Sequence, residues 1–311
     1  MLNVLVTGAT GFIGQHLIKC LKLNGLNVKI ISRKPVPGED VIICDFLKDK
    51  IPDNALKDID IVFHLAGYAH DLRDALEMEQ TYKKINVEVT DDLLSASVKH
   101  NVRKFIFVSS VKAGGVPVKG ICASEEDQGD PDGIYGRTKR EAELRILDVG
   151  RESSMHVSIL RPALIYGPKV KGNLQLMMQG INKGWFPPLP ETGNRRCMIH
   201  VDDIVQALLL LTNEKKTNGE IFIATDGRKY SSRNIYEIMR CVLGKPPLNW
   251  SIPKYLFSVI ALISANLRYK IDKLLGDECY SSEKLQSLGF KAQKELKQMN
   301  DIVPQQIKTT N

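Results

Sequence analysis

Tyr135 and Lys139 stand four positions apart in a stretch whose pattern predicts a helix. Residues i and i+4 share one face of a helix, so the two side chains are expected to be neighbours. A tyrosine with a pKa of about 10 is a poor base at neutral pH, but a nearby ammonium group favours the phenolate and lowers that pKa. The pair is then able to move a proton to or from a hydroxyl group while a hydride moves to or from a nicotinamide.

A hydroxyl group for the same reaction is available at the end of a predicted strand. The apolar run from Lys104 closes with Ser109 and Ser110. Ligands bind at the carboxyl edge of parallel sheets, where a serine can hydrogen-bond the reacting oxygen. A serine at this place can also satisfy a backbone group, and the pattern alone leaves both roles open.

Three glycines, Gly8, Gly11 and Gly14, lie between an apolar run and an amphipathic stretch that begins at Phe12. A glycine trio in the order strand, turn and helix indicates a dinucleotide site. The first glycine permits the tight turn, the second lets the backbone approach a pyrophosphate, and the third lets helix and strand pack closely. The helix N-terminus adds free N–H groups for the phosphates.

The end of the second predicted strand favours NADP over NAD as the cofactor. It contains Ser32, Arg33 and Lys34, and no carboxylate follows until Glu39. A carboxylate at this place binds the ribose 2′-hydroxyl of NAD, whereas an arginine suits the 2′-phosphate of NADP. The two cations can instead be exposed turn residues. Asp45, at the end of the third strand, is a candidate for a contact with adenine or for a strand-end cap.

Strands and helices alternate in the first half of the sequence, which predicts an α/β fold with a doubly wound parallel (Rossmann) sheet. The strands are apolar nearly throughout, as expected when helices cover both faces of the sheet. The stretch from Ile165 to Arg196 is rich in Gly and Pro, and we expect it to recognise the substrate. The predicted strands are 2–6, 27–33, 40–46, 60–67, 104–110, 156–162 and 219–227, and the predicted helices include 12–23, 81–101, 135–147 and 200–213.

This change in composition along the chain predicts two interleaved units. We expect a dinucleotide-binding Rossmann domain over residues 1–168, to which residues 200–227 return. A smaller substrate-binding lobe is expected over residues 169–199 and 228–311. The sequence shows no internal repeat and no linker between the two units.

Composition and cysteine usage exclude several classes of protein. The formal net charge is +7, but the Lys and Arg residues are scattered, which argues against nucleic acid as a partner. The six cysteines are widely spaced without a C-x-x-C pair, which indicates a reduced, cytoplasmic protein without a metal site. The apolar stretch from Tyr255 to Leu267 is too short to be an integral membrane segment. A buried helix is the favoured interpretation of that stretch, and a contact with a membrane surface is the alternative.

Together these motifs resemble the extended short-chain dehydrogenase/reductases, within the NAD-dependent epimerase/dehydratase family that acts on nucleotide sugars. The resemblance rests on TGATGFIG, CDF, HLAG, VSS, YGRTK, LRPALIYGP and RRCMIHVDD, and it covers nearly the whole chain. It implies Ser110 as the catalytic hydroxyl, Tyr135 as the acid or base and Lys139 as its partner. It also implies Asn173 as a substrate contact and Arg196 as the arginine that binds the nucleotide diphosphate. The implied cofactor-binding residues are Gly8, Gly11, Phe12, Ile13, Gly14, Arg33, Asp45, Phe46, Leu65, Ala66, Gly67 and Pro162.

Two departures from the family pattern bear on the reaction. Dehydratases of this family carry an Asp-Glu pair after the strand-end serine, whereas this chain has Val111 and Lys112, which argues against dehydration. Ala113, Gly114 and Gly115 replace the frequent Val-Tyr-Gly and leave the shape of the sugar pocket open. The motifs are most similar to a subgroup with UDP-hexosamine substrates for surface-polysaccharide synthesis.

Two reactions at C4 of a UDP-sugar fit this resemblance. A 4-ketoreductase takes hydride from NADPH, whereas a 4-epimerase, acting on UDP-glucose or UDP-N-acetylglucosamine, keeps NAD tightly bound. Arg33 favours the ketoreductase, whereas the frequency of epimerases in the family favours the epimerase. We prefer ketoreduction. A non-catalytic NADP-binding sensor of this fold usually lacks the Tyr-Lys pair, which this chain has. The family also implies a homodimer, built from the helix around Val89–Val98 and the helix that carries Tyr135.

Overall fold

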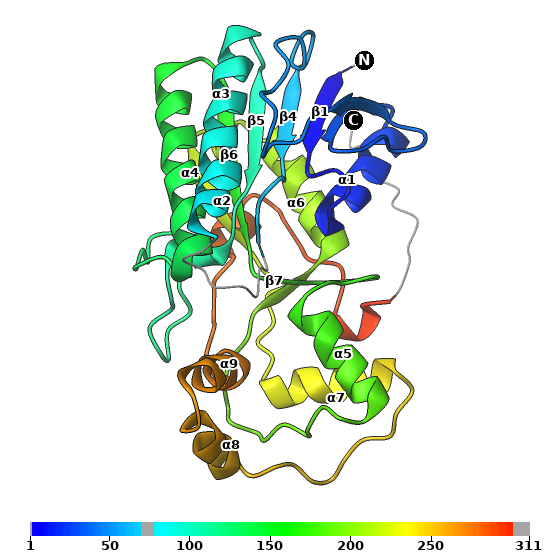
Figure 1. The fold of residues 1–311 in the computed structure, drawn as a ribbon, viewed down its shortest axis with the longest axis vertical. Helices are drawn as coiled ribbons and strands as arrows, with labels where there is room; N and C mark the ends of the chain where they lie inside the picture. The colour runs from blue at the N-terminus through cyan, green and yellow to red at the C-terminus, as the bar shows by residue number, and fades with distance from the viewer. Residues whose placement is uncertain (1, 70–77, 301–311) are drawn as a thin grey trace.

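The protein is described by a computed structural model that covers residues 2–69 and 78–300 (Figure 1). Within these residues, seven parallel strands form the central sheet. The strand order is β3-β2-β1-β4-β5-β6-β9, so the direction of winding switches between β1 and β4. The predicted doubly wound parallel sheet with a smaller lobe is confirmed. The strands are β1 (Asn3–Thr7), β2 (Asn27–Ser32), β3 (Asp40–Ile43), β4 (Ile61–His64), β5 (Lys104–Val108), β6 (His156–Pro162) and β9 (Glu220–Ala224).

Helices cover both faces of the sheet because its strands are apolar on both sides. On one face, α1 and α6 pack on strand residues such as Val6 and Phe63. On the other face, α3 and α4 pack on residues such as Leu5 and Phe105. A homodimer through α3 and α4 stays a prediction. These helices are α1 (Phe12–Leu23), α2 (Glu79–Lys83), α3 (Val89–Lys99), α4 (Gly133–Glu152) and α6 (Val201–Asn213).

A smaller lobe lies beyond the carboxyl edge of the sheet, at the lower end of Figure 1. Its core is partly aromatic and includes Tyr166 and Tyr236. After the lobe the chain returns to the sheet at α10 (Glu283–Ser287), where Leu285 packs in the core beneath α1 and α6. The last residues of the predicted lobe, 301–311, lie outside the described residues. The other elements are β7 (Leu164–Tyr166), β8 (Met198–His200), α5 (Asn173–Lys183), α7 (Ser232–Val242), α8 (Lys254–Ala261), α9 (Ala265–Leu275) and the turns η1 (Lys84–Glu88), η2 (Val111–Gly114), η3 (Lys215–Thr217) and η4 (Leu296–Gln298).

An ion pair between Glu143 of α4 and Arg161 of β6 is enclosed by the fold. Arg161 Nε and Nη2 donate to the two carboxylate oxygens of Glu143 at 2.8 and 2.5 Å, and the two side chains are 1% and 0% exposed. Arg161 Nη1 also donates to Gln128 Oε1 at 3.1 Å, and a Cβ on Gly114 would lie 2.9 Å from the same nitrogen. The pair therefore fixes α4 and the loop before it to β6.

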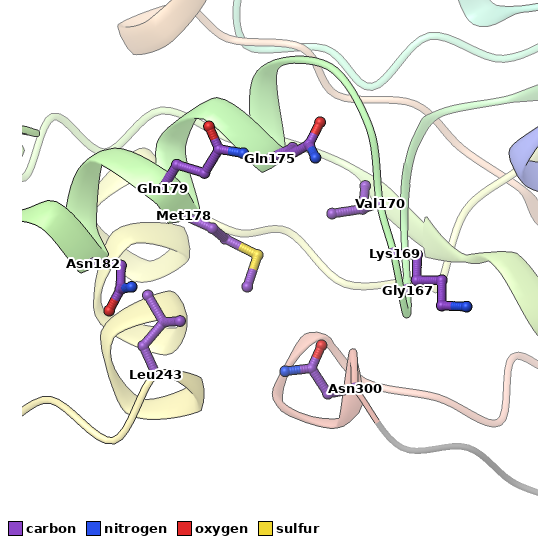
Figure 2. A pocket seen from close by; sticks show the side chains of 9 residues that line it. All are labelled: Gly167, Lys169, Val170, Gln175, Met178, Gln179, Asn182, Leu243 and Asn300. Atoms are coloured by element: carbon purple, nitrogen blue, oxygen red, sulfur yellow. The ribbon is translucent and has the colours of Figure 1, made fainter.

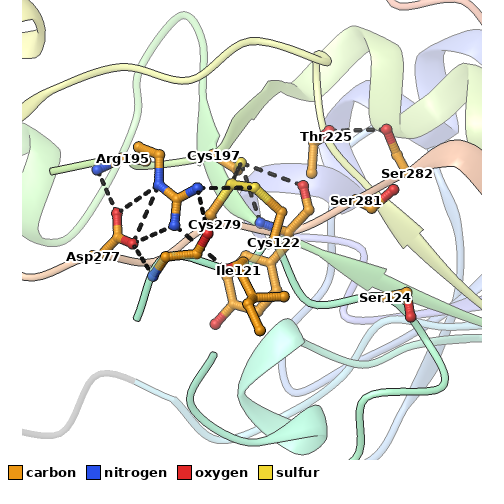
Figure 3. Close-up of a disulfide and its surroundings, with 12 residues drawn as sticks. Ile121, Cys122, Ser124, Arg195, Cys197, Thr225, Asp277, Cys279, Ser281 and Ser282 are labelled. Carbon is orange, nitrogen blue, oxygen red and sulfur yellow. Dashed lines mark hydrogen bonds and ion pairs between the residues drawn. A yellow bond between two sulfur atoms is a disulfide. The ribbon is translucent and has the colours of Figure 1, made fainter. Parts of the chain in front are cut away.

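Two of the six cysteines form a disulfide, so the expectation that all of them are reduced is wrong. Cys122 and Cys279 are 157 residues apart in the sequence, yet their Cα atoms are 4.4 Å apart (Figure 3). An isolated bridge between Ala123 and Tyr280 aligns the two segments. Spacing along the sequence cannot reveal a pairing that tertiary contacts create. The cysteine pattern therefore gives no support for a reducing compartment.

We expect Cys122→Ser to lower the free energy of unfolding by about 2–5 kcal/mol in the absence of reductant. The disulfide restricts the unfolded chain, and the effect grows with the length of the loop it closes. Urea unfolding measures the difference, which should disappear when a reductant opens the bond. Cys241→Ser, at an exposed free cysteine, is the matched control. A thiol titration of the untreated protein that finds Cys122 and Cys279 free would contradict the assignment.

The stretch from Tyr255 to Leu267 lies at the surface, so its interpretation as a buried helix is wrong. It forms α8 and the start of α9, and within α8 only Phe257 is buried. Leu262 and Ile263, in the turn between the two helices, are 74% and 71% exposed. An apolar run looks the same in the sequence whether other elements cover it or not. In the described ranges 2–69 and 78–300, no helix has the length and apolar character needed to cross a bilayer.

Candidate active site

The glycine turn is packed so tightly that two of its positions have no room for a side chain. Gly8 has a φ of +69°, and a Cβ there would lie 2.6 Å from Ala66 N and 2.7 Å from Leu65 C. A Cβ on Gly14 would lie 2.3 Å from Gly8 O. Gly11 N donates to Gly8 O at 2.9 Å, and α1 begins directly after Gly11. The turn therefore presents the N–H groups of a helix N-terminus at the end of β1, as pyrophosphate binding requires.

A neutral histidine links the glycine turn to the neighbouring strand. Thr7 Oγ1 is 2.6 Å from His64 Nδ1, and His64 Nε2 is 3.0 Å from Thr90 Oγ1. Burial lowers the pKa of His64 to about 3, so the ring carries no charge at neutral pH. Thr90 Oγ1 donates to Asn86 O, so we infer that it accepts from His64 Nε2–H and that Nδ1 accepts from Thr7. Ala66 N donates to Thr7 Oγ1 at 3.2 Å, which joins the TGATGFIG and HLAG segments.

Ser110, Tyr135 and Lys139 come together at the carboxyl edge of the sheet. Ser110 follows β5, and its Oγ accepts from Lys112 N at 3.3 Å at the start of η2. Tyr135 and Lys139 lie near the start of α4, and Ser110 is close enough to Tyr135 to lower the pKa of its phenol. Lys139 Nζ donates to Val108 O at 3.0 Å. The three residues implied for catalysis therefore belong to one site.

The Lys139 ammonium group lies between the ends of β4 and β5. Its Nζ is 4.4 Å from the centroid of the Phe107 ring, and a Cβ on Gly67 would lie 3.0 Å from the same nitrogen. Burial lowers the pKa of Lys139 to about 8, and the negative charge of Glu143 opposes this shift. Lys139 is therefore mainly protonated at neutral pH and loses its charge as the pH rises through about 8.

The expected lowering of the Tyr135 pKa is not found in the protein chain alone. Burial raises the pKa of Tyr135 to about 12, and the contributions that lower it come from Lys112 and from the hydrogen bond with Ser110. Dehydratases of this family carry an acidic residue at the position of Lys112. In this chain Lys112 Nζ donates to Asp132 Oδ2 at 2.9 Å. At neutral pH Tyr135 is a phenol, which suits it to donate a proton.

Asn86, which the sequence patterns did not single out, joins three parts of the site. It is buried in η1, a π-helical turn inside the predicted helix 81–101. Asn86 Oδ1 accepts from Tyr68 N at 2.7 Å, and Nδ2 donates to Thr138 Oγ1 at 3.0 Å. Thr138 precedes Lys139 on α4, so Asn86 helps to position the helix that carries Tyr135 and Lys139. In the sequence, the only sign of Asn86 is a polar residue between two apolar ones. In the structure, its π-helical turn is a feature that is frequent at functional sites.

The end of β2 offers a cation to a cofactor, and no carboxylate follows that cation before Glu39. Arg33 is exposed directly after the strand. Glu39, the first carboxylate after it, is paired with Lys22 at 2.8 Å. Asp45 Oδ1 accepts from Leu47 N at 3.2 Å, so this side chain caps the turn after β3. The contact of Asp45 with adenine stays a prediction.

The other predicted cofactor-binding residues stand at the same edge of the sheet. Parallel strands end on one side, so residues that follow different strands lie around one site. They are Phe12 and Ile13 at the start of α1, Phe46 after β3, Leu65, Ala66 and Gly67 after β4, and Pro162 at the end of β6.

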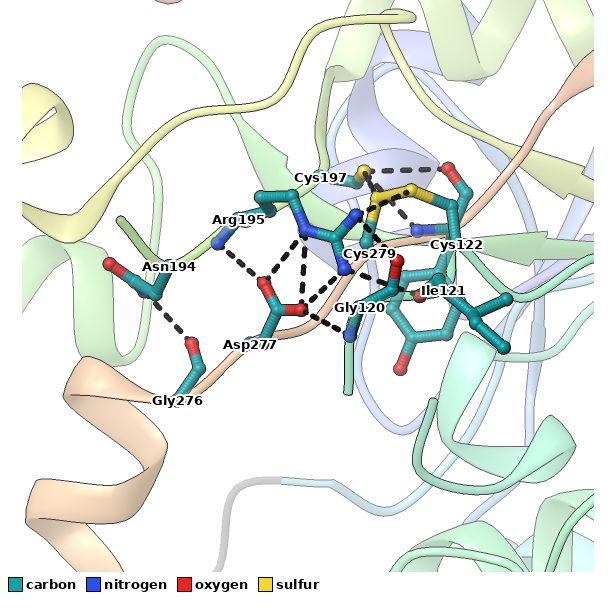
Figure 4. A network of polar contacts seen from close by, with 10 residues as sticks. Gly120, Ile121, Cys122, Asn194, Arg195, Cys197, Gly276, Asp277 and Cys279 are labelled. Carbon is teal, nitrogen blue, oxygen red and sulfur yellow. Dashed lines mark hydrogen bonds and ion pairs between the residues drawn. A yellow bond between two sulfur atoms is a disulfide. The ribbon is translucent and has the colours of Figure 1, made fainter. Parts of the chain in front are cut away.

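Carboxylates hold two arginines in the segment that the sequence predicts to bind substrate. Arg196 Nη2 donates to Glu278 Oε2 at 2.9 Å, and its Nη1 donates to Lys273 O. Arg195 donates to Asp277 from its backbone N at 2.6 Å and from Nη2 at 2.5 Å (Figure 4). A diphosphate bound by Arg196 must therefore share the guanidinium with Glu278 or displace that carboxylate.

Asn173, the second predicted substrate contact, begins α5 and is exposed. Beside α5 lies a hollow of about 280 Å³ (Figure 2). Ser110, Tyr135 and Lys139 are absent from its lining, so the hollow is separate from the predicted chemistry. The lining residues are Gly167, Lys169, Val170, Gln175, Met178, Gln179, Asn182, Leu243 and Asn300.

Comparison with known proteins assigns most of the chain to one family. Residues 4–224 match the NAD dependent epimerase/dehydratase family. The chain is 31% identical to a UDP-glucose 4-epimerase of Vibrio cholerae over 260 residues. The aligned residues cover 81% of this chain and 78% of that protein. The chain belongs to the NAD-dependent epimerase/dehydratase family. The resemblance drawn from the sequence motifs is thereby confirmed.

Two further comparisons extend this family assignment over the lobe. The N-acetyl-alpha-D-glucosaminyl-diphospho-ditrans,octacis-undecaprenol 4-epimerase of Escherichia coli O157:H7 is 26% identical, over 93% of this chain and 90% of that one. The structure of MoeE5 in complex with UDP-glucose and NAD matches with a TM-score of 0.76 and 25% identity, over 96% of this chain and 95% of that one. The likeness therefore includes the sheet and the lobe of this epimerase/dehydratase family member.

The family implies a nicotinamide dinucleotide, and the residues of this site fit one. The turn leaves no room for a side chain at Gly8 or Gly14, and it places the N-terminus of α1 where a pyrophosphate could bind. A Cβ on Gly67 would lie 3.0 Å from Lys139 Nζ, so a larger residue after β4 would crowd the lysine. The glycine turn and the Tyr135–Lys139 pair therefore lie at the same edge of the sheet, as a bound dinucleotide would require.

Proposed function

We propose that this enzyme reduces the C4 ketone of a UDP-linked 4-keto sugar of hexosamine type, with NADPH as the hydride source. The end of β2 carries the proposal, because Arg33 is exposed there and Glu39 is already paired with Lys22. An arginine without a competing carboxylate suits the 2′-phosphate of NADPH. The phenolic state of Tyr135 at neutral pH supports the direction of reduction, in which the enzyme must supply a proton.

In this proposal each polar residue of the site has one task. When bound, the reduced nicotinamide supplies a hydride to C4. Tyr135 donates its phenolic proton to O4, so that the ketone becomes an alcohol. Ser110 hydrogen-bonds O4 and orients it toward Tyr135. Lys139 stabilises the phenolate that the transfer leaves, because an ammonium group favours the charged form of a nearby acid.

A UDP-sugar 4-epimerase with tightly held NAD is the second candidate. The relative from Vibrio cholerae carries that function in its name, and the same three polar residues can serve it. In an epimerase, Tyr135 takes the proton from O4 and returns it after the keto sugar has turned over. We rank the epimerase second because no carboxylate stands between Arg33 and Glu39 to bind the ribose of NAD, and Glu39 itself is paired with Lys22.

One assay separates these candidates. Purified protein is mixed with NADPH or NADH and UDP-4-keto-6-deoxy-N-acetylhexosamine, and nicotinamide absorbance is followed. Rapid oxidation of NADPH, with much slower oxidation of NADH, establishes the reductase. No net oxidation, together with interconversion of UDP-glucose or UDP-N-acetylglucosamine with its C4 epimer, establishes the epimerase. If the protein binds NADP but turns over none of these sugars, a non-catalytic NADP-binding sensor is the remaining candidate.

We expect Arg33→Asp to reverse the cofactor preference of the proposed reductase. A hydrogen bond to a charged group contributes about 1.5–3 kcal/mol, so KM for NADPH should rise about 10- to 100-fold while KM for NADH does not rise. Steady-state kinetics with both cofactors measures the change. Lys19→Asp, at an exposed cation on α1, is the control for net charge. Equal increases of both KM values would contradict the role of Arg33.

A further inference from the structure

Six neighbouring apolar residues of α8 and the turn after it are 40–74% exposed. Figure 1 shows α8 at the outer end of the lobe, with α9 beside it. Phe257 alone within α8 is buried, so most of the circumference of this helix lacks cover from the described chain. We call these six residues the α8 patch. They are Tyr255, Leu256, Val259, Ile260, Leu262 and Ile263.

The α8 patch differs from single exposed apolar residues elsewhere on the protein. Leu23, the last residue of α1, and Leu47, in the turn after β3, are for example 61% and 47% exposed, but they belong to separate segments. Single apolar residues at a surface are ordinary and need no explanation. A contiguous exposed group with polar residues at its rim marks a surface that meets another molecule or a membrane.

Charge and aromatic residues at the rim of the α8 patch indicate what it meets. Lys254, Arg268 and Lys270 are exposed around it, and Asp272 is the single carboxylate of the sequence between positions 250 and 276. Trp250 and Tyr269 flank the patch and are 60% and 54% exposed. Cations attract anionic lipid headgroups, and amphipathic aromatic rings prefer the boundary between headgroups and acyl chains.

We propose that the α8 patch inserts into the interface of a bilayer that contains anionic lipid, and that the enzyme binds to membranes peripherally. A helix exposed on several sides suits a fluid phase that surrounds it, whereas a protein partner would cover one face. The helix is too short to cross the bilayer and lies in its plane, with apolar side chains reaching about 5–10 Å into the interface. This inference does not depend on which sugar is reduced or epimerised.

Binding through the α8 patch would place the substrate side of the site next to the membrane. Lys273 belongs to α9, and its carbonyl oxygen accepts a hydrogen bond from Arg196, the predicted diphosphate-binding residue. The cationic rim and this arginine are therefore linked through one helix. A membrane at α8 would hold the enzyme close to any lipid-attached acceptor or donor of its sugar.

Cosedimentation of the full chain with lipid vesicles tests the proposal. We expect binding to vesicles of phosphatidylcholine with 30% phosphatidylglycerol, a composition of about one-third anionic lipid, and weaker binding to phosphatidylcholine alone. The double variant Leu262→Glu/Ile263→Glu should reduce binding to the anionic vesicles at least about tenfold, because it removes two apolar groups and adds two negative charges. Lys254→Glu/Lys270→Glu should reduce it about tenfold at low salt and less at high salt.

The matched control is Leu23→Glu/Leu47→Glu, which makes the same change at exposed apolar residues outside the patch and should bind as the unaltered protein does. Circular dichroism verifies that each variant is folded. Two outcomes would overturn the proposal. One is failure of the unaltered protein to sediment with either vesicle. The other is a dimer in analytical ultracentrifugation that the Leu262→Glu/Ile263→Glu variant dissociates, because the patch would then belong to a second copy of the chain.

Discussion

Tyr135→Phe should lower kcat about 10²- to 10⁴-fold, the usual contribution of a positioned acid or base, while KM for the nicotinamide cofactor changes little. The substitution removes the proton donor but keeps the aromatic ring. That ring contacts Tyr82 edge-on, with 6.5 Å between the two centroids, so the packing around α4 is preserved. Steady-state kinetics of the assay described above measures both constants.

Two further measurements separate loss of the acid from general damage to the site. Tyr82→Phe removes the hydroxyl of the neighbouring ring, and it should retain most of the activity. The unaltered enzyme should lose activity as the pH rises through about 8, because Lys139 loses the charge that stabilises the Tyr135 phenolate. Activity of Tyr135→Phe within a few fold of the unaltered enzyme would show that another group supplies the proton.

Glu143→Gln should lower the free energy of unfolding by about 3–5 kcal/mol, since it leaves the buried Arg161 charge without its counter-ion. The pair is bidentate and its side chains are 1% and 0% exposed, so water cannot replace the lost partner. Urea unfolding followed by circular dichroism measures the effect. Activity should fall as well, because the same arginine holds the loop that leads to α4.

A double substitution and a surface control test this explanation. Glu143→Leu/Arg161→Met should recover most of the lost stability, because an apolar pair has no buried charge to compensate. Asp148→Ala removes an ion pair whose two side chains, Arg151 and Asp148, are 72% and 59% exposed. That change should cost less than about 1 kcal/mol. Equal effects of Glu143→Gln and Asp148→Ala would contradict the special place of the buried pair.

The sheet and the catalytic edge could be predicted because their signals are local. A strand buried on both faces is a continuous apolar run, and the run predicted at 156–162 is β6 as the structure has it. The helix predicted at 12–23 is α1 for the same reason, since its amphipathic pattern is complete. Parallel strands end at one edge, so the glycine turn and Ser110 had to meet there.

The features that were missed depend on contacts between distant segments. Cys122 and Cys279 meet because two loops align, which no spacing rule contains. Asn86 acquires its role through a π-helical turn and a hydrogen bond to α4. The high pKa of Tyr135 arises from burial that the Tyr-Lys spacing cannot express. The apolar run of α8 reads as core, and only the arrangement of the lobe shows that it is exposed.

The bond between Cys122 and Cys279 closes residues 122–279 into a covalent ring. Tyr135 and Lys139 lie inside the ring, whereas Ser110 and the glycine turn precede it. A protease that cuts the ring once leaves a single covalent molecule, which separates into two fragments only after reduction. The joined segments also border Arg195, whose Nη1 donates to Cys122 Sγ at 3.6 Å. The bond therefore ties the segment that leads from α9 back to the sheet to the loop between η2 and α4.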